Sequence, residues 1–204
     1  QELYEEWAKS LRKHYWPIYP DKEDINDLGR RLTDHEKEHG YYNTKPILSP
    51  DGENIVFFSD RSGFIEIYVM SALDGHIIRK VVGGSKSNRY ESLHVLTSSM
   101  CFDPSGEKVA FVAKSAGHDA LFVRNIKNGN ERRYDIPSQG LTGPAWNPKR
   151  DEIALSATYH GQTDLLLVNL KDGKTRRLTS DAADQLTPRF FPDGTGQLLR
   201  KNSD

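Results

Sequence analysis

A proline-centred turn recurs four times along the chain. The first copy is Pro46-Ile47-Leu48-Ser49-Pro50-Asp51-Gly52, and related segments begin at Met100, Pro144 and Pro188. The turn prolines stand at positions 50, 104, 148 and 192, which gives spacings of 54, 44 and 44 residues. A period of about 40–45 residues is typical of a four-stranded β-propeller blade. The repeat therefore predicts an all-β chain built from such blades.

Each repeat carries the same series of strand and turn signals. The proline turn is followed by an apolar run, a glycine turn, a second apolar run and a tight-hairpin dipeptide. The dipeptides are Asp74-Gly75, Asn128-Gly129 and Asp172-Gly173. A charged last strand follows, as expected of an exposed edge that resists aggregation. We predict blades at about 43–84, 97–138 and 141–181, and a truncated fourth blade at 185–204.

The residues in front of the first blade predict a short α-helical arm. Residues 1–16 place one apolar stripe on a helix, formed by Leu3, Tyr4, Trp7, Ala8, Leu11 and Tyr15. Residues 21–32 can form a second helix with Ile25, Leu28 and Leu32 facing inward. We therefore expect a helical arm or linker at 1–40 and a partial propeller at 41–204.

Three blades and part of a fourth do not close a ring, because propellers usually have about four to eight blades. We expect the chain to belong to a longer protein. The alternative is completion by another chain, for example in a homodimer that completes the ring.

The first blade resembles the TolB-type, WD40-like propeller repeat. The resemblance rests on Ser49-Pro50-Asp51-Gly52, Ser59-Asp60-Arg61-Ser62-Gly63 and Ile67-Tyr68. It extends over about residues 41–204, and the third blade departs from it at Asn147-Pro148-Lys149-Arg150. The resemblance implies a domain of a multidomain bacterial protein in the periplasm or cell envelope, where such propellers stand beside peptidase-like or barrel domains.

Composition excludes several classes of function. The formal net charge of −1 provides no field for nucleic acid or an anionic membrane. No apolar run reaches the ~18 residues of a membrane-spanning helix. The first residues do not resemble a signal peptide. The single cysteine, Cys101, is most simply a small buried apolar residue.

One segment matches a zinc-peptidase pattern. His35-Glu36-Lys37-Glu38-His39 fits H-E-x-x-H, in which two histidines bind zinc and the glutamate activates water. We do not favour zinc binding by His35, Glu36 and His39, because the helix would be short and no later histidine stands out as a third ligand. Nor does the chain contain a G-x-S-x-G nucleophile turn or a glycine-rich phosphate loop. We expect no cofactor and no catalytic residue in this chain.

The longer first spacing places about ten extra residues between the first two blades. They fall within 83–94, and a surface insertion of this kind costs little. If the insertion is instead a recognition loop, its contact residues are Arg89, Tyr90, Glu91 and His94. Asp60 and Arg61, at a hairpin tip, form a second candidate surface, although they can equally brace neighbouring turns.

The sequence favours a non-catalytic propeller module for protein–protein interaction within a larger cell-envelope protein. Its partner would be another protein or the domains that flank it in the parent chain. The first alternative is an enzyme, either the accessory propeller of a hydrolase or peptidase or a zinc peptidase. The second is a propeller that binds a small molecule or ion.

Overall fold

The computed structural model describes residues 2–15, 28–38, 40–84, 89–180, 185–194 and 197–201. The chain forms two compact units, Gln1–Leu32 and Thr33–Asp204, which we describe separately. The boundary after residue 40 that we expected between arm and propeller stays a prediction.

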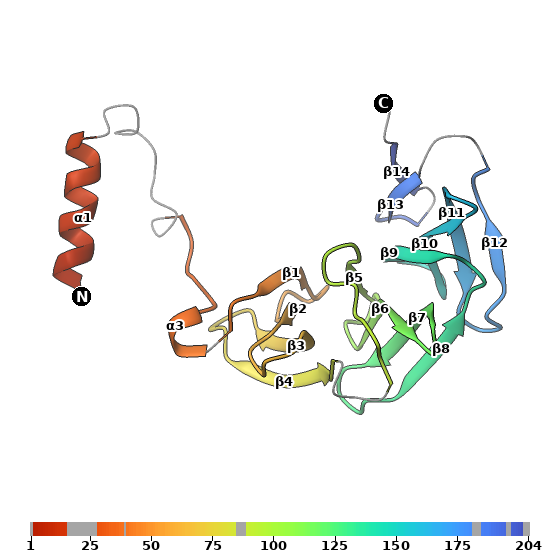
Figure 1. Ribbon diagram of the computed structural model, residues 1–204, viewed down its shortest axis with the longest axis horizontal. Helices are drawn as coiled ribbons and strands as arrows, with labels where there is room; N and C mark the ends of the chain where they lie inside the picture. The colour runs from red at the N-terminus through yellow and green to blue at the C-terminus, as the bar shows by residue number, and fades with distance from the viewer. Residues whose placement is uncertain are drawn as a thin grey trace. The chain divides into compact units, whose positions relative to one another are not determined.

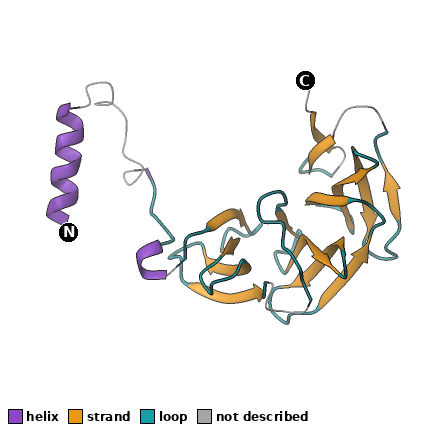
Figure 2. Cartoon of the chain, viewed as in Figure 1, coloured by secondary structure: helices purple, strands orange, loops and turns teal. Residues whose placement is uncertain are grey.

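The first unit contains the helix α1, Glu2–Tyr15, which confirms the helical arm (Figures 1 and 2). Its apolar stripe is largely exposed, with Leu3, Tyr4, Trp7 and Tyr15 each more than half accessible to solvent. Most of the second predicted helix, with Ile25, lies outside the described residues, and Leu28 is exposed. No helix in the described part of the chain is long and apolar enough to span a membrane.

The second unit begins with a short helix, α3 (His35–Glu38), and continues as antiparallel sheets (Figure 1). The first sheet contains β1 (Asn43–Leu48), β2 (Asn54–Ser59), β3 (Glu66–Ser71) and β4 (Ile77–Val82) in that order. The second contains β5 (Met100–Phe102), β6 (Lys108–Ser115), β7 (His118–Asn125) and β8 (Glu131–Asp135). The third contains β9 (Gly140–Trp146), β10 (Glu152–Tyr159), β11 (Gln162–Asn169) and β12 (Thr175–Arg177).

A final two-stranded sheet pairs β13 (Gln185–Phe190) with β14 (Gln197–Lys201). Within this unit each sheet packs on the next, and the first strands β1, β5, β9 and β13 contact one another in sequence. The architecture is therefore an incomplete β-propeller of three four-stranded blades and two strands of a fourth, as the repeat predicts.

The proline turns adopt the geometry that their residues favour. Gly52 has φ of +78°, and its N–H donates to the Ser49 carbonyl at 2.9 Å. The third blade has no glycine in this turn. There the Asn147 side chain accepts a hydrogen bond from the Lys149 N–H at 2.9 Å. An Asx-type turn thus replaces the glycine turn, which explains how this blade departs from the repeat without losing its hairpin.

The core lies between neighbouring blades. One apolar cluster joins the first blade to the second and includes Val56, Phe58, Phe111 and Phe122. Another joins the second blade to the third and includes Val112, Leu121, Ile153 and Leu155. Successive β6 side chains point to opposite faces, so Phe111 packs toward the first blade and Val112 toward the third. This two-sided burial is the physical reason that the strand is apolar without interruption from Val109 to Ala113.

Hydrogen bonds from arginine side chains also connect the blades. Arg79 of β4 donates from Nη1 to the carbonyl oxygens of Ile126 and Lys127, at 3.3 and 2.5 Å. Arg132 of β8 makes the equivalent hydrogen bonds from the second blade to the third. Its Nη1 and Nη2 donate to the carbonyls of Leu170 and Lys171, at 2.6 and 3.0 Å. We call Arg79 and Arg132 the inter-blade arginines.

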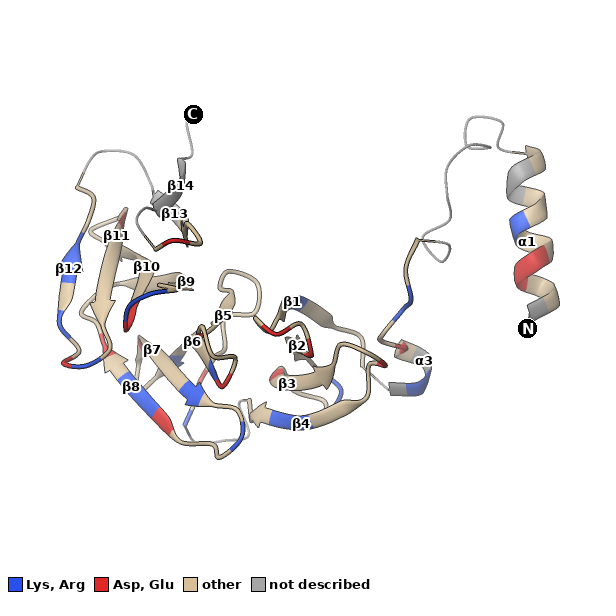
Figure 3. Ribbon diagram, turned by 180° about the vertical axis from the view of Figure 1, so that it is seen from behind, with Lys and Arg blue, Asp and Glu red and all other residues tan. Residues whose placement is uncertain are grey.

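The outer strands carry most of the positive charge near these contacts, as Figure 3 shows for β4, β8 and β12. Arg176 of β12 stands in the same register as the inter-blade arginines, because it pairs with Leu167 as Arg132 pairs with Val123. Within the described residues, the Arg176 guanidinium has no hydrogen-bond acceptor. On the inner side, Lys45 of β1 donates to the carbonyls of Leu96 and Ser98, at 3.0 and 2.6 Å.

Candidate functional site

The segment 89–94 before β5 packs against the second blade. The Glu91 N–H donates to the Lys114 carbonyl, and the Lys114 N–H donates to the Ser92 carbonyl, both at 2.8 Å. This segment therefore pairs with the end of β6 through an isolated β-bridge. Residues 85–88 of the same insertion lie outside the described residues.

Tyr90 is a core residue, with only 4% of its surface exposed. Its ring packs edge-on against Phe111 and Phe122, with centroid distances of 5.8 and 5.1 Å. Its hydroxyl donates to the carboxylate of Glu131, which also receives Arg89 at 3.1 Å. Burial and the neighbouring carboxylate both raise the pKa of the Tyr90 hydroxyl. The arrangement keeps this hydroxyl protonated and fixes the segment to β8.

Glu91 and His94 also make contacts within the chain. Glu91 Oε1 accepts a hydrogen bond from the Gly117 N–H at 2.8 Å. His94 Nε2 lies 2.7 Å from Asp119 Oδ1, and Asp119 Oδ2 accepts the Leu141 N–H at 3.2 Å. Asp119 thus connects the insertion to the start of the third blade. The sequence prediction that these residues contact a partner stays a prediction, and the structure gives each an internal hydrogen bond or ion pair.

Asp60 and Arg61 lie at the β2–β3 hairpin tip, away from the 89–94 segment in sequence. Asp60 Oδ1 accepts the Tyr42 N–H at 2.9 Å. The Arg61 guanidinium lies over the rings of Phe57 and Tyr68, 5.4 and 5.0 Å from their centroids. Both residues therefore brace the first blade, and their role in binding a partner likewise stays a prediction.

The zinc-peptidase pattern falls only partly on described residues. His35 begins α3, and its Nδ1 donates to the Gly40 carbonyl at 2.6 Å. His39 lies outside the described residues, and so does the side chain of Glu36. In the ranges that the structure describes, no group of three or more His, Cys, Asp or Glu could hold a metal ion.

Cys101 packs against the cluster between the second and third blades. Burial raises the pKa of its thiol to about 12. A thiol with this pKa is protonated at neutral pH and is a poor nucleophile. This geometry agrees with the expectation that Cys101 is an apolar core residue.

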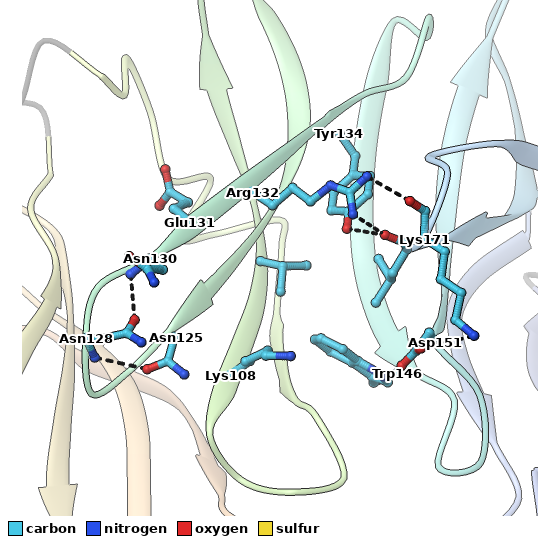
Figure 4. Close-up of a pocket in the computed structure, with 12 residues that line it drawn as sticks. Lys108, Asn125, Asn128, Asn130, Glu131, Arg132, Tyr134, Trp146, Asp151 and Lys171 are labelled. Atoms are coloured by element: carbon cyan, nitrogen blue, oxygen red, sulfur yellow. Dashed lines mark hydrogen bonds and ion pairs between the residues drawn. The ribbon is translucent and has the colours of Figure 1, made fainter.

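A pocket of about 490 Å³ lies between the second and third blades (Figure 4). We call it the inter-blade pocket, and among its lining residues are Lys108, Asn125, Asn128, Trp146, Asp151 and Lys171. It lies at the end of β7 opposite His118, where the β7–β8 hairpin of one blade faces the β11–β12 hairpin of the next. In the predicted recognition segment, Glu91 and His94 lie toward the other end of the blades, where the segment pairs with the end of β6. Arg89 and Tyr90 instead bind Glu131, which lines the pocket.

The sequence prediction did not include the inter-blade pocket. Asn128-Gly129 indicated a hairpin, and nothing further was inferred from Asn125, Asn128 and Asn130. The sequence signal for the pocket is the presence of three asparagines within six residues, because a tight turn alone requires fewer asparagines. The contribution of Trp146 comes from the next blade and depends on packing that no local pattern specifies.

The fold and repeat define the chain as a β-propeller protein. A family model described as "TolB beta propeller domain" matches residues 90–203, which is more than half of the chain. The chain belongs to the TolB β-propeller domain family.

Solved structures show the same fold. The chain is similar to TolB from Acinetobacter baumannii, with a TM-score of 0.62 and 17% identity over 80% of this chain and 39% of that one. A protein assigned as TolB from Agrobacterium tumefaciens gives a TM-score of 0.63 and 19% identity, covering 78% and 54%. A puromycin-hydrolysing peptidase from Mycobacterium tuberculosis gives 0.53 and 16%, covering 71% and 24%. The chain thus spans less than two thirds of each of these proteins.

Proposed function

We propose that this chain is a non-catalytic propeller module that binds a protein partner within a larger protein of the bacterial cell envelope. Membership of the TolB β-propeller domain family supports this proposal at the level of the fold. Placement in the periplasm is part of the same proposal and rests on the family resemblance.

The observation that carries the proposal concerns the histidine and cysteine side chains that could serve in catalysis. They contact other residues of the propeller. His94 is paired with Asp119 at 2.7 Å, His118 with Asp135 at 3.0 Å, and Cys101 is partly buried against the apolar cluster. A general base or nucleophile needs access to a substrate and an activating neighbour. Burial raises the pKa of the Cys101 thiol, so it lacks such activation. Both histidines are held by carboxylates of the second blade, and the loops at the blade ends present a polar surface of the kind that propellers use for recognition.

The experiment is photo-crosslinking in cells that express the protein. A benzoylphenylalanine at Pro137 probes the blade end that carries Glu91 and His94, and one at Lys149 probes the opposite end. Both positions are exposed, as is Thr175 on the outer strand β12, which serves as the control. We expect a discrete protein adduct from Pro137 and none from Thr175.

The contribution of the predicted recognition residues is tested on the same adduct. Arg89 is 59% exposed at its side chain, and Arg89→Ala should lower the adduct yield several-fold. Lys127→Ala, an exposed change at the opposite blade end, should leave the yield unchanged. Adducts that form equally at all three probe positions, or at none, would contradict the proposal.

The alternative is an accessory propeller of a hydrolase, and it is favoured by the peptidase among the similar structures. That protein is described as hydrolysing puromycin, and this chain covers 24% of it. The alternative requires a parent polypeptide that hydrolyses amide substrates and loses that activity when its catalytic nucleophile is replaced. A parent polypeptide that forms the crosslink and hydrolyses none of these substrates would favour the interaction module.

A further inference from the structure

The inter-blade pocket combines an apolar floor with a polar rim. Val123, Tyr134, Trp146 and Leu170 contribute the apolar part, and the Tyr134 hydroxyl donates to the Leu170 carbonyl at 2.8 Å. A volume of about 490 Å³ suits a small organic molecule. A pocket of this kind usually orients its ligand by a few polar groups. The donors and acceptors that have no partner within the protein therefore indicate which class of ligand the pocket can bind.

The carboxylates that line the pocket are already bound by other side chains. Glu131 receives Arg89 at 3.1 Å and Arg124 at 3.2 Å, in addition to the Tyr90 hydroxyl. Asp151 lies 3.7 Å from the Lys171 ammonium. Glu131 is therefore committed to the protein itself, whereas Asp151 forms a solvent-exposed ion pair.

Two of the three asparagine side chains that line the pocket, Asn125 and Asn128, are committed in the same way on their oxygen atoms. Asn125 Oδ1 accepts from the backbone N–H groups of Lys127 and Asn128, at 2.9 and 3.0 Å. Asn128 Oδ1 accepts from the Asn130 N–H at 2.8 Å. Because only the oxygen of an amide can accept, these bonds fix the orientation of both side chains and leave both Nδ2 groups as donors.

Two further donors accompany these amides. The Lys108 ammonium and the Trp146 indole N–H have no acceptor among the residues that the structure describes. Figure 4 shows the Lys108 side chain directed toward Trp146, between the asparagine hairpin and Lys171. The unpaired groups of the pocket thus include several hydrogen-bond donors, one of them a cation, beside an aromatic ring.

We propose that the inter-blade pocket binds a small organic carboxylate. The carboxylate accepts hydrogen bonds from Lys108 and the Asn125 amide, and the ring or apolar body of the ligand lies against Trp146. A neutral ligand of the same size leaves the ammonium unpaired, so it binds more weakly. The pocket shares Glu131 with the recognition segment, through Arg89 and Tyr90. The proposal rests on Lys108, Asn125 and Trp146 and does not depend on the protein partner proposed above.

Trp146 reports directly on occupancy, because it lines the pocket and the chain has only two other tryptophans. We would titrate the protein with glucuronate, with hippurate and with neutral glucose, following tryptophan fluorescence and confirming affinity by calorimetry. Saturable binding of one carboxylate, with glucose at least 10-fold weaker, is expected. Glucuronate and hippurate distinguish a sugar acid from a peptide-like acid as the source of the carboxylate.

The decisive variant is Asn125→Asp. It keeps the oxygen that accepts from Lys127 and Asn128, so the hairpin is retained, and it replaces the donor amide with a repelling negative charge. We expect at least a 10-fold loss of carboxylate affinity in Asn125→Asp and in Lys108→Met. Lys127→Met, just outside the pocket, should bind as the unchanged protein does. Equal binding of glucose, full affinity in Asn125→Asp, or no saturable binding of either acid would overturn the proposal.

Discussion

Glu66 and Asp164 place carboxylates near the start of the third strand of their blades, and both are buried. Asp164 is paired with Arg177 and accepts from the Thr179 hydroxyl. Glu66 accepts from the Tyr68 hydroxyl at 2.5 Å and the Ser62 hydroxyl at 2.7 Å, and it is paired with Lys80 at 3.1 Å. A buried charge is tolerated only with such partners, so each acid holds its hairpin in one geometry.

The pH dependence of stability tests the role of Glu66. Burial raises its pKa, but the hydrogen bonds from Tyr68, Ser62 and Lys80 outweigh burial and hold the pKa below its usual 4.5. The stabilising contribution is therefore present above the unfolded pKa and lost as pH falls through the lower native pKa. We expect Glu66→Gln to lower the free energy of unfolding by about 2 kcal/mol at pH 7. The difference from the unchanged protein should shrink below pH 4.5.

Urea unfolding at a series of pH values measures this difference. Glu107→Gln is the matched control, because Glu107 is half exposed and its pair with Lys127 spans 3.4 Å at the surface. A surface pair contributes little, so the control should change stability by less than about 0.5 kcal/mol. A constant difference between Glu66→Gln and the unchanged protein from pH 7 to pH 3 would show that the charge of Glu66 is not involved.

At the scale of the element, the blades are joined by apolar packing and by the inter-blade arginines. Arg132 also lies over the Tyr134 ring, 4.9 Å from its centroid. Its guanidinium therefore covers an aromatic face while it satisfies two backbone carbonyls of the neighbouring hairpin. Loss of this side chain leaves those carbonyls to compete for water at a packed interface, which costs free energy.

We expect Arg132→Ala to lower the free energy of unfolding by about 2 kcal/mol, from the two lost hydrogen bonds and the lost cation–π contact. Arg176→Ala provides the internal comparison, since Arg176 holds the same register and finds no acceptor in the described residues. It should change stability by less than about 0.5 kcal/mol. Equal losses in both variants, measured by urea unfolding, would mean that the carbonyl contacts contribute nothing.

The elements of the propeller follow from local patterns in the sequence, whereas several of the contacts between them do not. The proline spacing and the hairpin dipeptides were sufficient to predict the sheets, because turn chemistry is local. The charged pairs of the outer strands predict protection of an exposed edge, but Arg79 and Arg132 bind backbone carbonyls of the next blade. Backbone acceptors carry no residue signature, so no pattern could reveal them. Tyr90, an aromatic residue within a polar segment, was the one visible sign that the insertion is anchored in the core.

At the scale of the whole molecule, the second blade holds a special position in the propeller unit. It contributes to both apolar clusters, so its strands are covered on both faces. The two-stranded sheet of β13 and β14 has fewer partners of its own. Opening of the second blade requires loss of both clusters, whereas a two-stranded sheet is only marginally stable by itself.

Hydrogen exchange followed by mass spectrometry tests this gradient. We expect the slowest exchange in β6 and β7 and the fastest strand exchange in β13 and β14. Phe111→Ala, at a residue that is 1% exposed, should lower the free energy of unfolding by about 3–5 kcal/mol and speed exchange in the first and second blades together. Uniform exchange over all sheets would contradict a core arranged in successive inter-blade layers.

The inter-blade arginines have a consequence for how such a protein can be rebuilt. Each supplies a side chain from one blade and requires only main-chain oxygens from its neighbour, so the accepting hairpin is free to vary in sequence. The two accepting hairpins do differ, with Asn128-Gly129 in the second blade and Asp172-Gly173 in the third. If blades are exchanged between proteins of this kind, each contact between neighbouring blades needs to keep one arginine donor and one tight hairpin. Recombination can change the other side chains of the hairpin without loss of the hydrogen bonds between the blades.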